Sequence, residues 1–568
     1  MTNFDDILLE VGVFGRFQKR IFSLVSLVSI PWAFIYVGVV FQGFTPEHWC
    51  RNPSAEELRR TCGWTLEEEQ RYTVPLVNGS TGPEYSRCRM YDVDWNSTAV
   101  SCEGAPLLNF TKDAPVIDCK DGWVYNYGER KTFAMEFNLV CSDAWKVDLS
   151  QSVLNLGFLL GTIVIGYLAD RFGRKICFIV SSVVNGITGV LVAFSPTSEA
   201  LLILRGVCGF TIKGGWMAGY VLITELVGVD HRRIVGIIYQ KFFSVGIIIL
   251  PLIAYFITDW RWIQVAISVP YFIFLIYYWL IPESPRWLFS QKQTGRAVAI
   301  VEKLAKENGR CLSPLTEKLT DGEATEVQMP SFLDLFRTPK IRRCTFILMF
   351  NWFVCAVVYQ GLIMRVGILG GNVYVDFLIS GAVEFPSAVI ILLTIERVGR
   401  RLPFGIATVM AGVACLTAAF IPEDAYWAKT AVACVGRLGI TISFELVCFM
   451  NSELYPTFMR NLGVAVCSTL CDIGGMAAPF ILYRLASIWL ELPLVVFGEY
   501  CLLADILINT TLNNYHLPDH FKTSIHFLNF SLPELQAFIP VHPKLSPGDP
   551  LWLQVFVPTS FIISDSIL

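Results

Sequence analysis

The most constraining feature of this chain is a series of eleven long apolar runs. About 20 consecutive apolar residues are needed to cross the hydrocarbon core of a bilayer. The runs lie at 21–43, 148–168, 177–194, 201–227, 234–256, 264–281, 344–368, 374–395, 402–420, 426–450 and 461–487. A twelfth run, 492–508, is weaker because it contains Glu499 and Asp505. The sequence therefore predicts an all-α polytopic membrane protein with twelve transmembrane helices, or eleven if the last run does not insert.

Composition supports this fold class. Of 568 residues, 54% are hydrophobic and 16% are charged, whereas a soluble domain carries about 25% charged residues. The first apolar run begins at Ile21, is long enough to span, and has no small-residue cleavage site after it, so it does not resemble a signal peptide. The phosphate-binding pattern GxxxxGK[ST] does not occur, which argues against an ATP-driven pump. We find no nucleophile constellation and expect neither an enzyme nor a cofactor.

Basic residues set the expected orientation. Arg16, Lys19 and Arg20 precede the first run, so the positive-inside rule places the N-terminus in the cytoplasm. The basic loops at 171–175, 232–233 and 397–401 then fall on that same side. This predicts a cytoplasmic N-terminus (1–20), an N-terminal half (21–281) with an extracellular segment (45–147), a cytoplasmic linker (282–343), a C-terminal half (344–508) and a tail (509–568).

The expected extracellular segment carries the marks of an oxidising compartment. It holds an even number of cysteines, Cys50, Cys62, Cys88, Cys102, Cys119 and Cys141. Six cysteines form three disulfides in any of fifteen connectivities, and the sequence does not choose among them. The segment also holds three acceptor sequences for N-glycosylation, at Asn78, Asn96 and Asn109. No cysteine or histidine spacing indicates a metal site.

Two stretches far apart repeat one another. GYLADRFGRK at 166–175 resembles LLTIERVGRR at 392–401, and ITELVGVDHRR at 223–233 resembles NSELYPTFMRN at 451–461. The aligned residues are Asp170 with Glu396, Arg171 with Arg397, Gly173 with Gly399, Arg174 with Arg400, Glu225 with Glu453 and Arg232 with Arg460. Two similar halves of six spans are typical of a transporter built from repeats. The alternative is that basic loops recur in any membrane protein.

These motifs carry a family resemblance. DRFGRK, ERVGRR and PESPRWL (282–288) resemble the major facilitator superfamily. The cysteine-rich first loop narrows this to the organic cation, anion and zwitterion transporter family, and FDDILLEVGVFGRFQKR, KGGWMAGY and CDIGG resemble its organic cation transporters. The resemblance runs from about residue 4 to 498 and then stops, so the tail 509–568 looks like unrelated sequence. It implies that the DRFGRK and ERVGRR loops latch the two halves together; a solvated surface loop is the alternative.

Acidic residues within the apolar runs are the candidate substrate site. An ionisable residue at mid-span costs about 2.5–3.5 kcal/mol and usually faces a cavity or a partner. Asp472, Glu445 and Glu384 lie well inside runs, and Asp148 lies near the outer end of the second. The family resemblance implies that Asp472 attracts the cation. The alternative is an ion pair with Lys213 or another base of the fourth run, and a structural role stays open for Glu445 and Glu384.

Aromatic residues form the second part of the candidate site. Protonated amines and quaternary ammonium groups bind over aromatic faces. Trp32 and Tyr36, Trp216 and Tyr220, and Trp352 and Tyr359 each lie on one helical face. We expect Phe242, Phe444 and Phe449 to join them, with Gln360 as a polar contact. Packing or an interfacial belt is the alternative; the resemblance favours binding for Trp216, Trp352 and Tyr359.

The expected function is a plasma-membrane uniporter for monoamines and other small organic cations, working by alternating access. The inside-negative potential contributes about 2.3 kcal/mol per charge per 100 mV. A sodium-coupled carrier of carnitine-like zwitterions, or a non-transporting isoform without a normal twelfth span, is the alternative. The expected partners are small organic cations and the lipid bilayer, with no nucleic acid; a homo-oligomer is left open.

Overall fold

The fold is known from a computed structural model. It describes residues 4–78, 83–93, 114–126, 128, 130–310, 334–365, 372–395, 397–422, 425–455 and 460–513. All of them belong to one compact unit, Met1–Phe521.

The described residues include twelve helical segments long and apolar enough to cross a membrane. In the N-terminal half they are α2 (Arg16–Ser26) with α3 (Ser29–Val37) and α4 (Val39–Gln42), then α9 (Trp145–Phe172), α10 (Arg174–Ala193), α11 (Ser198–Leu226), α12 (Val229–Phe256), and α13 (Trp260–Ser268) with α14 (Pro270–Ile273), η2 (Phe274–Ile276) and α15 (Tyr277–Leu280). In the C-terminal half they are α19 (Pro339–Arg365), α20 (Val373–Ala382) with α21 (Glu384–Thr394), α22 (Arg401–Phe420), α23 (Tyr426–Leu454), α24 (Arg460–Ala486) and α25 (Leu492–Asn513). The predicted helical class and all eleven runs are confirmed, and the doubtful twelfth run also forms a helix.

Prolines account for the three interrupted spans. Pro31, Pro270 and Pro386 each lie at the start of the second helix of a broken span. A proline lacks an N–H and clashes with the carbonyl four residues before it, so the helix ends just upstream. In the eighth span this places Glu384 at the first residue of α21 rather than in a helix interior. The apolar runs alone did not predict these breaks.

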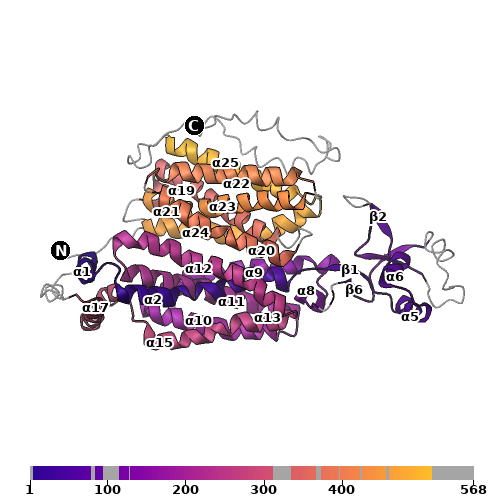
Figure 1. The fold of residues 1–568 in the computed structure, drawn as a ribbon, viewed down its shortest axis with the longest axis horizontal. Helices are drawn as coiled ribbons and strands as arrows, with labels where there is room; N and C mark the ends of the chain where they lie inside the picture. Colours follow the sequence, from indigo (N-terminus) through magenta and orange to yellow (C-terminus); the bar gives the residue numbers. More distant parts are fainter. Residues whose placement is uncertain are drawn as a thin grey trace. The chain divides into compact units, whose positions relative to one another are not determined.

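Each half packs mainly within itself, and three helix pairs make most of the backbone contacts between the halves in the described part of the chain. Helices α9, α10 and α11 pack together, as do α19 with α24 and α22 with α23 and α25 (Figure 1). Between the halves, α24 lies against α9, and α12 lies against α20 and α21. Near the start of α9, the Ser152 hydroxyl donates to the carbonyl oxygen of Met476 at 2.7 Å, and the Asn155 amide donates to that of Gly475 at 2.9 Å.

The internal repeat is visible in the backbone. Gly173 and Gly399 have φ angles of +106° and +86°, a region that side chains other than glycine's rarely allow. The arginine after each glycine, Arg174 or Arg400, donates to the carbonyl oxygen five residues before it, at 3.1 Å in both halves. The two loops therefore share one turn and one hydrogen bond, which recurrence of basic residues alone would not produce.

Helices of the linker hold the N-terminal segment. This part comprises α1 (Phe4–Val11), α16 (Pro285–Ser290), α17 (Thr294–Asn308) and α18 (Asp334–Arg337). The Asn308 amide donates to the Val11 carbonyl at 3.0 Å and to the Gln18 side chain at 2.9 Å, and its oxygen accepts from the Phe17 N–H at 3.1 Å. The start of the chain is thus fixed to the linker.

The long segment after the first span is built from short elements. They are β1 (Glu47–Cys50), α5 (Pro53–Cys62), α6 (Leu66–Thr73), β2 (Leu76–Asn78), β3 (Pro83–Tyr85), β4 (Arg89–Tyr91), β5 (Val116–Asp118), β6 (Trp123–Asn126), α8 (Phe133–Glu136) and η1 (Cys141–Asp143). The strands pair antiparallel as β1 with β6, β2 with β3 and β4 with β5. An all-helical reading of the chain missed these strands because they are only three or four residues long.

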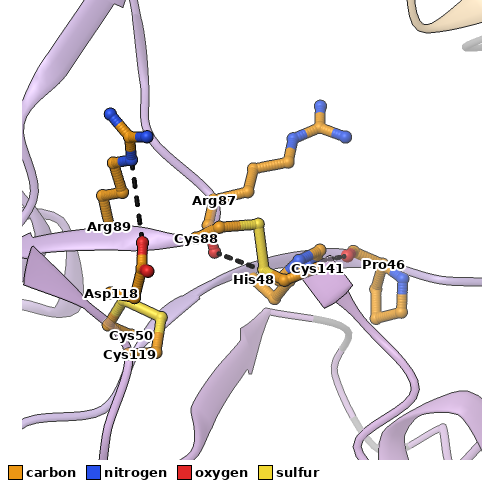
Figure 2. Close-up of a disulfide and its surroundings, with 9 residues drawn as sticks. All are labelled: Pro46, His48, Cys50, Arg87, Cys88, Arg89, Asp118, Cys119 and Cys141. Atoms are coloured by element: carbon orange, nitrogen blue, oxygen red, sulfur yellow. Dashed lines mark hydrogen bonds and ion pairs between the residues drawn. A yellow bond between two sulfur atoms is a disulfide. The ribbon is translucent and has the colours of Figure 1, made fainter. Parts of the chain in front are cut away.

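Disulfides tie these elements together. Cys50 bonds Cys119 and Cys88 bonds Cys141 (Figure 2), and Cys62 is also disulfide-bonded. Cys102 lies outside the described residues. The ring of His48 lies close to the sulfurs of Cys88 and Cys141, but a disulfide leaves neither sulfur available as a thiolate ligand. Asn78 ends β2 without a described side chain, and Asn96 and Asn109 lie outside the described residues, so glycosylation stays a prediction.

A polar contact anchors this segment to the helices. The Glu136 carboxylate accepts from the Trp260 indole N–H at 2.7 Å and from Arg261 Nε at 3.1 Å. Burial would raise the pKa of Glu136, but the hydrogen bonds from Arg261 and Trp260 outweigh it and hold the pKa below its ordinary value. The backbone adds two bonds of 3.1 Å, from Lys131 N–H to the Thr258 carbonyl and from Trp260 N–H to the Lys131 carbonyl.

One of the two acids of the last helix has polar partners. Asp505 accepts from the side-chain amide of Asn509 at 2.9 Å, and Arg401 of α22 donates to that side chain's oxygen at 3.2 Å. Glu499 is partly exposed. Helix α25 packs against α22 and α19, with the Phe497 ring fully buried. The run therefore forms a packed helix although it contains two acids.

Twelve crossings place both ends of the described chain on one side of the membrane, whereas eleven place them on opposite sides. We expect epitope tags before residue 4 and after Asn513 to bind antibody only after cells are permeabilised. A tag at the surface-exposed Asp121, within the segment between the first two spans, is the matched control and should bind antibody on intact cells. Antibody binding to the tag after Asn513 on intact cells, with the N-terminal tag still protected, would contradict a spanning α25.

Candidate functional site

Each of the three acids predicted inside the apolar runs lies in a buried acid–base pair among the spanning helices. Lys213 of α11 pairs with Asp472 of α24, and Lys241 of α12 pairs with Glu445 of α23. Both pairs connect one half to the other. The third pair, Arg437 of α23 with Glu384, lies within the C-terminal half. The ion-pair alternative for Asp472 is therefore what the structure shows, and the same is true of Glu445 and Glu384.

Glu384 is the most densely bonded of the three acids. Its carboxylate accepts from the Tyr359 hydroxyl at 3.0 Å and from the Ser244 hydroxyl of α12 at 2.6 Å. The Arg437 guanidinium lies 4.2 Å from the Tyr359 ring centre and also donates to the Tyr359 carbonyl at 3.0 Å. Glu384 is 2% exposed, so these contacts compensate for a carboxylate that water does not reach.

Aromatic rings of the N-terminal half form one continuous cluster. Trp32 lies 4.9 Å from Trp216 and 6.1 Å from Tyr36, and Trp216 lies 6.0 Å from Tyr220, between ring centres. The Trp216 indole N–H donates to the Ser29 hydroxyl at 3.0 Å. The four residues predicted in this half are therefore brought together, from two spans.

The C-terminal half supplies a smaller cluster. Phe444 lies 5.6 Å from Trp352 and 5.8 Å from Tyr359, so it connects the two rings predicted there. Gln360 is buried, and neither polar atom of its side chain has a hydrogen-bond partner among the described residues.

Tyr36 connects the aromatic cluster of the N-terminal half to the Lys213–Asp472 pair. The ammonium of Lys213 lies 5.8 Å from the Phe158 ring, and Phe158 lies 5.5 Å from Tyr36. Phe242 does not join this group through any described ring contact; its ring lies 6.4 Å from Phe22. Acids and aromatic faces thus meet where the halves join, an arrangement that suits a hydrophobic cation.

The predicted gate residues contact their own half and the linker. Arg174 pairs with Asp170 at 2.8 Å and with Glu225 at 3.3 Å. The Glu283 carboxylate accepts from the Arg174 backbone N–H at 3.0 Å, and the Trp287 indole donates to the Asp170 carbonyl at 2.7 Å. These contacts fix the turn, and they do not by themselves latch one half to the other.

The remaining gate residues are described less fully. Arg171 and Arg397 are exposed, and Arg232 donates to the carbonyl oxygens of Thr224 and Val227 at 2.9 and 3.0 Å. Glu396 lies outside the described residues, and the side chains of Glu453 and Arg460 are not described, so the second copy of these contacts stays a prediction.

Two bases of the site were missed from the sequence. Lys241 in IIYQKFFSVG and Arg437 in ACVGRLGIT each interrupt an apolar run. An ionisable residue at such a position signals a function whatever its sign, so the rule applied to Asp472 would have found both.

A cavity within the C-terminal half adjoins the site at Arg437. It is also lined by Arg365, Asp376 and Lys429, among others. Arg365 and Lys429 both bond Glu491, and Asp376 accepts from the Tyr426 hydroxyl. Arg365, Lys429 and Glu491 thus balance their charges within one half.

The chain resembles known transporters over most of its length. The family model described as "Sugar (and other) transporter" matches residues 118–502. Solute carrier family 22 member 2 of Rattus norvegicus is 50% identical over 513 residues, which cover 89% of this chain and 92% of that protein. Solute carrier family 22 member 3 of Mus musculus is 51% identical over 501 residues, covering 88% and 91%. The resemblance to organic cation transporters that the motifs predicted is confirmed by these relatives.

A solved structure supports the fold. The xylose transporter XylE from E. coli, in a partially occluded inward-open conformation, superposes with a TM-score of 0.54 at 14% identity, covering 86% of this chain and 97% of that one. The predicted major facilitator fold is confirmed.

Removing one partner of the Arg437–Glu384 pair should destabilise the fold, because it leaves a buried charge uncompensated. We expect Arg437→Met to lower the free energy of unfolding by about 3–5 kcal/mol. The measurement is the thermal unfolding of purified protein in detergent, with the exposed Arg171→Met as the matched control. Adding Glu384→Gln to Arg437→Met should restore much of the loss. Equal melting temperatures for Arg437→Met and the unmodified protein would contradict this account.

Proposed function

The chain belongs to the sugar (and other) transporter family and, within it, to solute carrier family 22, and on this premise we propose that it carries small organic cations by uniport, monoamines among them. Relatives of this kind support an organic cation transporter that spans the plasma membrane several times. Uniport and the preference for monoamines are our proposals. They rest on the charges and rings at the join between the halves.

The observation that carries the proposal is Asp472. Its carboxylate is 5% exposed, comes from α24 of one half, and lies against α11 of the other. An ionised acid at the centre of a membrane helix costs about 2.5–3.5 kcal/mol of free energy. Because Asp472 lies at the interface between the two halves, we infer that it binds the substrate. Lys213 balances the charge while no substrate is present.

Aromatic rings provide the second contribution to binding of the cation. A cation over an aromatic ring gains about 0.5–2 kcal/mol, more where water is excluded. Trp32, Tyr36 and Trp216 on one side and Trp352 and Tyr359 on the other come from different halves. Flat rings impose few directional demands, so such a site accepts amines of different shapes.

Alternating access follows from where the pairs lie. Lys213–Asp472 and Lys241–Glu445 connect the halves, so movement of one half against the other must rearrange them. A cation bound among these acids changes which positive group each acid pairs with. It thereby changes the free energy of moving one half against the other. The inward electrical force on the cation adds about 2.3 kcal/mol per 100 mV, and the proposal needs no coupled ion.

We propose topology and gate roles on the same basis. The N-terminus and linker lie in the cytoplasm, and the disulfide-bonded segment 45–147 lies outside and carries sugars on Asn78, Asn96 and Asn109. The loops around Asp170 and Glu396, with Glu225 and Glu453, hold the cytoplasmic ends of the helices. The Arg174 contacts support this role in the N-terminal half.

The test is Asp472→Asn, which keeps the shape of the side chain and removes its charge. We expect uptake of tetraethylammonium to fall at least about tenfold, equivalent to about 1.4 kcal/mol of lost binding or barrier, while surface biotinylation stays unchanged.

Asp118→Asn is the matched control, because Asp118 is 89% exposed at the side chain and far from the spans in sequence; it should transport normally. Asp472→Glu should keep part of the uptake. Normal uptake by Asp472→Asn at the normal surface level would remove Asp472 from the binding site.

A further inference from the structure

Lys241 makes its described polar contacts only with the opposite half. It lies on α12 of the N-terminal half and is 8% exposed. Its ammonium donates to the Glu445 carboxylate of α23 and, at 2.8 Å, to the Ser387 hydroxyl of α21. Both acceptors belong to the C-terminal half. The ammonium of a lysine in one half is therefore paired with a carboxylate of the other half.

Glu445 has an oxygen free to face a second positive group. One of its carboxylate oxygens accepts from Lys241, and the other, Oε2, is buried without a hydrogen-bond partner among the described residues. A carboxylate accepts at about four lone-pair positions. An unmet buried acceptor of this kind needs an explanation, and a positive group that arrives at another stage of transport provides one.

Lys241 also differs from Arg437 in how firmly it is held. Arg437 donates to Glu384 and to the Tyr359 carbonyl and stacks on the Tyr359 ring. A planar guanidinium bonded and stacked in this way is fixed in place, whereas a lysine carries a compact ammonium on a flexible four-carbon stem. An organic ammonium presents the same charge to Glu445 as the ammonium of Lys241 does.

We propose that Lys241 is a tethered cation that occupies Glu445 in the empty carrier and gives way to the positive group of the substrate. This inference rests on the proposed function and adds a residue that sets affinity and transport mode. The substrate competes with Lys241 for Glu445, so the lysine weakens apparent affinity. When the substrate has left, Lys241 restores the pair that joins α12 to α23, so the empty carrier can reorient without an unpaired acid.

The effects of Lys241 on apparent affinity and on reorientation of the empty carrier distinguish this role from a purely structural ion pair. Lys241→Met keeps an unbranched side chain of similar length and removes the charge. We expect the half-saturation concentration for tetraethylammonium to fall about tenfold, equivalent to about 1.4 kcal/mol. Net uptake into cells without internal substrate should slow, while exchange against internal tetraethylammonium should persist, so the ratio of exchange to net uptake should rise about tenfold.

Charge-matched competitors give a readout that a packing defect would not change. Choline and 3,3-dimethylbutan-1-ol have similar shapes, but only choline is charged. Lys241→Met should strengthen inhibition by choline and leave inhibition by the alcohol unchanged. Equal strengthening of both would show a change of shape in the site and would overturn the proposal.

Companion variants test whether Lys241 acts through Glu445. Lys241→Arg keeps the charge, so it should keep the exchange ratio of the unmodified protein; because a guanidinium is held more firmly than an ammonium, it should raise the half-saturation concentration rather than lower it. In a Glu445→Gln background, Lys241→Met should cause no further fall in half-saturation, because the shared partner is gone. If Lys241→Met does not reach the surface, Ser387→Ala gives a second reading: it removes one bond that holds Lys241 and should lower half-saturation about threefold, a change within the usual strength of one hydrogen bond.

The experiments distinguish failure of the Lys241 proposal from failure of the proposed transport function. If the unmodified protein at the cell surface transports no tetraethylammonium, choline or monoamine, the proposed function fails. If the unmodified protein transports and Lys241→Met shows unchanged half-saturation and an unchanged exchange ratio, the tethered cation is wrong while the function stands. The same holds if Lys241→Met has its full effect in the Glu445→Gln background.

Discussion

Charged side chains that lie among membrane helices need partners, and among the described residues two acid–base pairs run from one half of the bundle to the other. Lys213 with Asp472 and Lys241 with Glu445 draw α11 and α12 toward α24 and α23. Breaking such a pair by removing one partner is expensive, whereas exchanging one cation for another is not. A carrier that binds an organic cation can therefore use its substrate as the replacement partner, which ties binding to the movement of the halves.

The rest of the structure keeps these charges in position. The glycine turns at Gly173 and Gly399, with matching arginine bonds, shape equivalent loops in each half. The break at Pro386 places Glu384 at a helix start, where α12 also reaches it through Ser244. Disulfides tie together the segment between the first two spans, and the Glu136 contact holds that segment on the helices. The aromatic clusters then surround the charges with surfaces that favour cations.

The sequence predicted much of this fold because membrane spans depend on local composition. The eleven runs, the repeat around Asp170 and the cysteine-rich segment are all properties of contiguous stretches. The site was predicted only in part. An isolated Asp472 in an apolar run indicates that a partner or a cavity exists, but not which, because Lys213 lies 259 residues away. Lys241 and Arg437 required the fold itself, since only packing shows which acid each base meets. The short strands were missed because three residues carry too little pattern.

The central claim is that one organic cation crosses with its own charge and without a coupled ion, at a site whose acids are otherwise balanced by the protein's own bases. The most direct test measures current and radiolabelled tetraethylammonium uptake together in the same voltage-clamped cells, in sodium-free solution. The account predicts an inward current of about one elementary charge per cation taken up, growing as the membrane potential becomes more negative. Electroneutral uptake, or uptake that stops when sodium is removed, would contradict it.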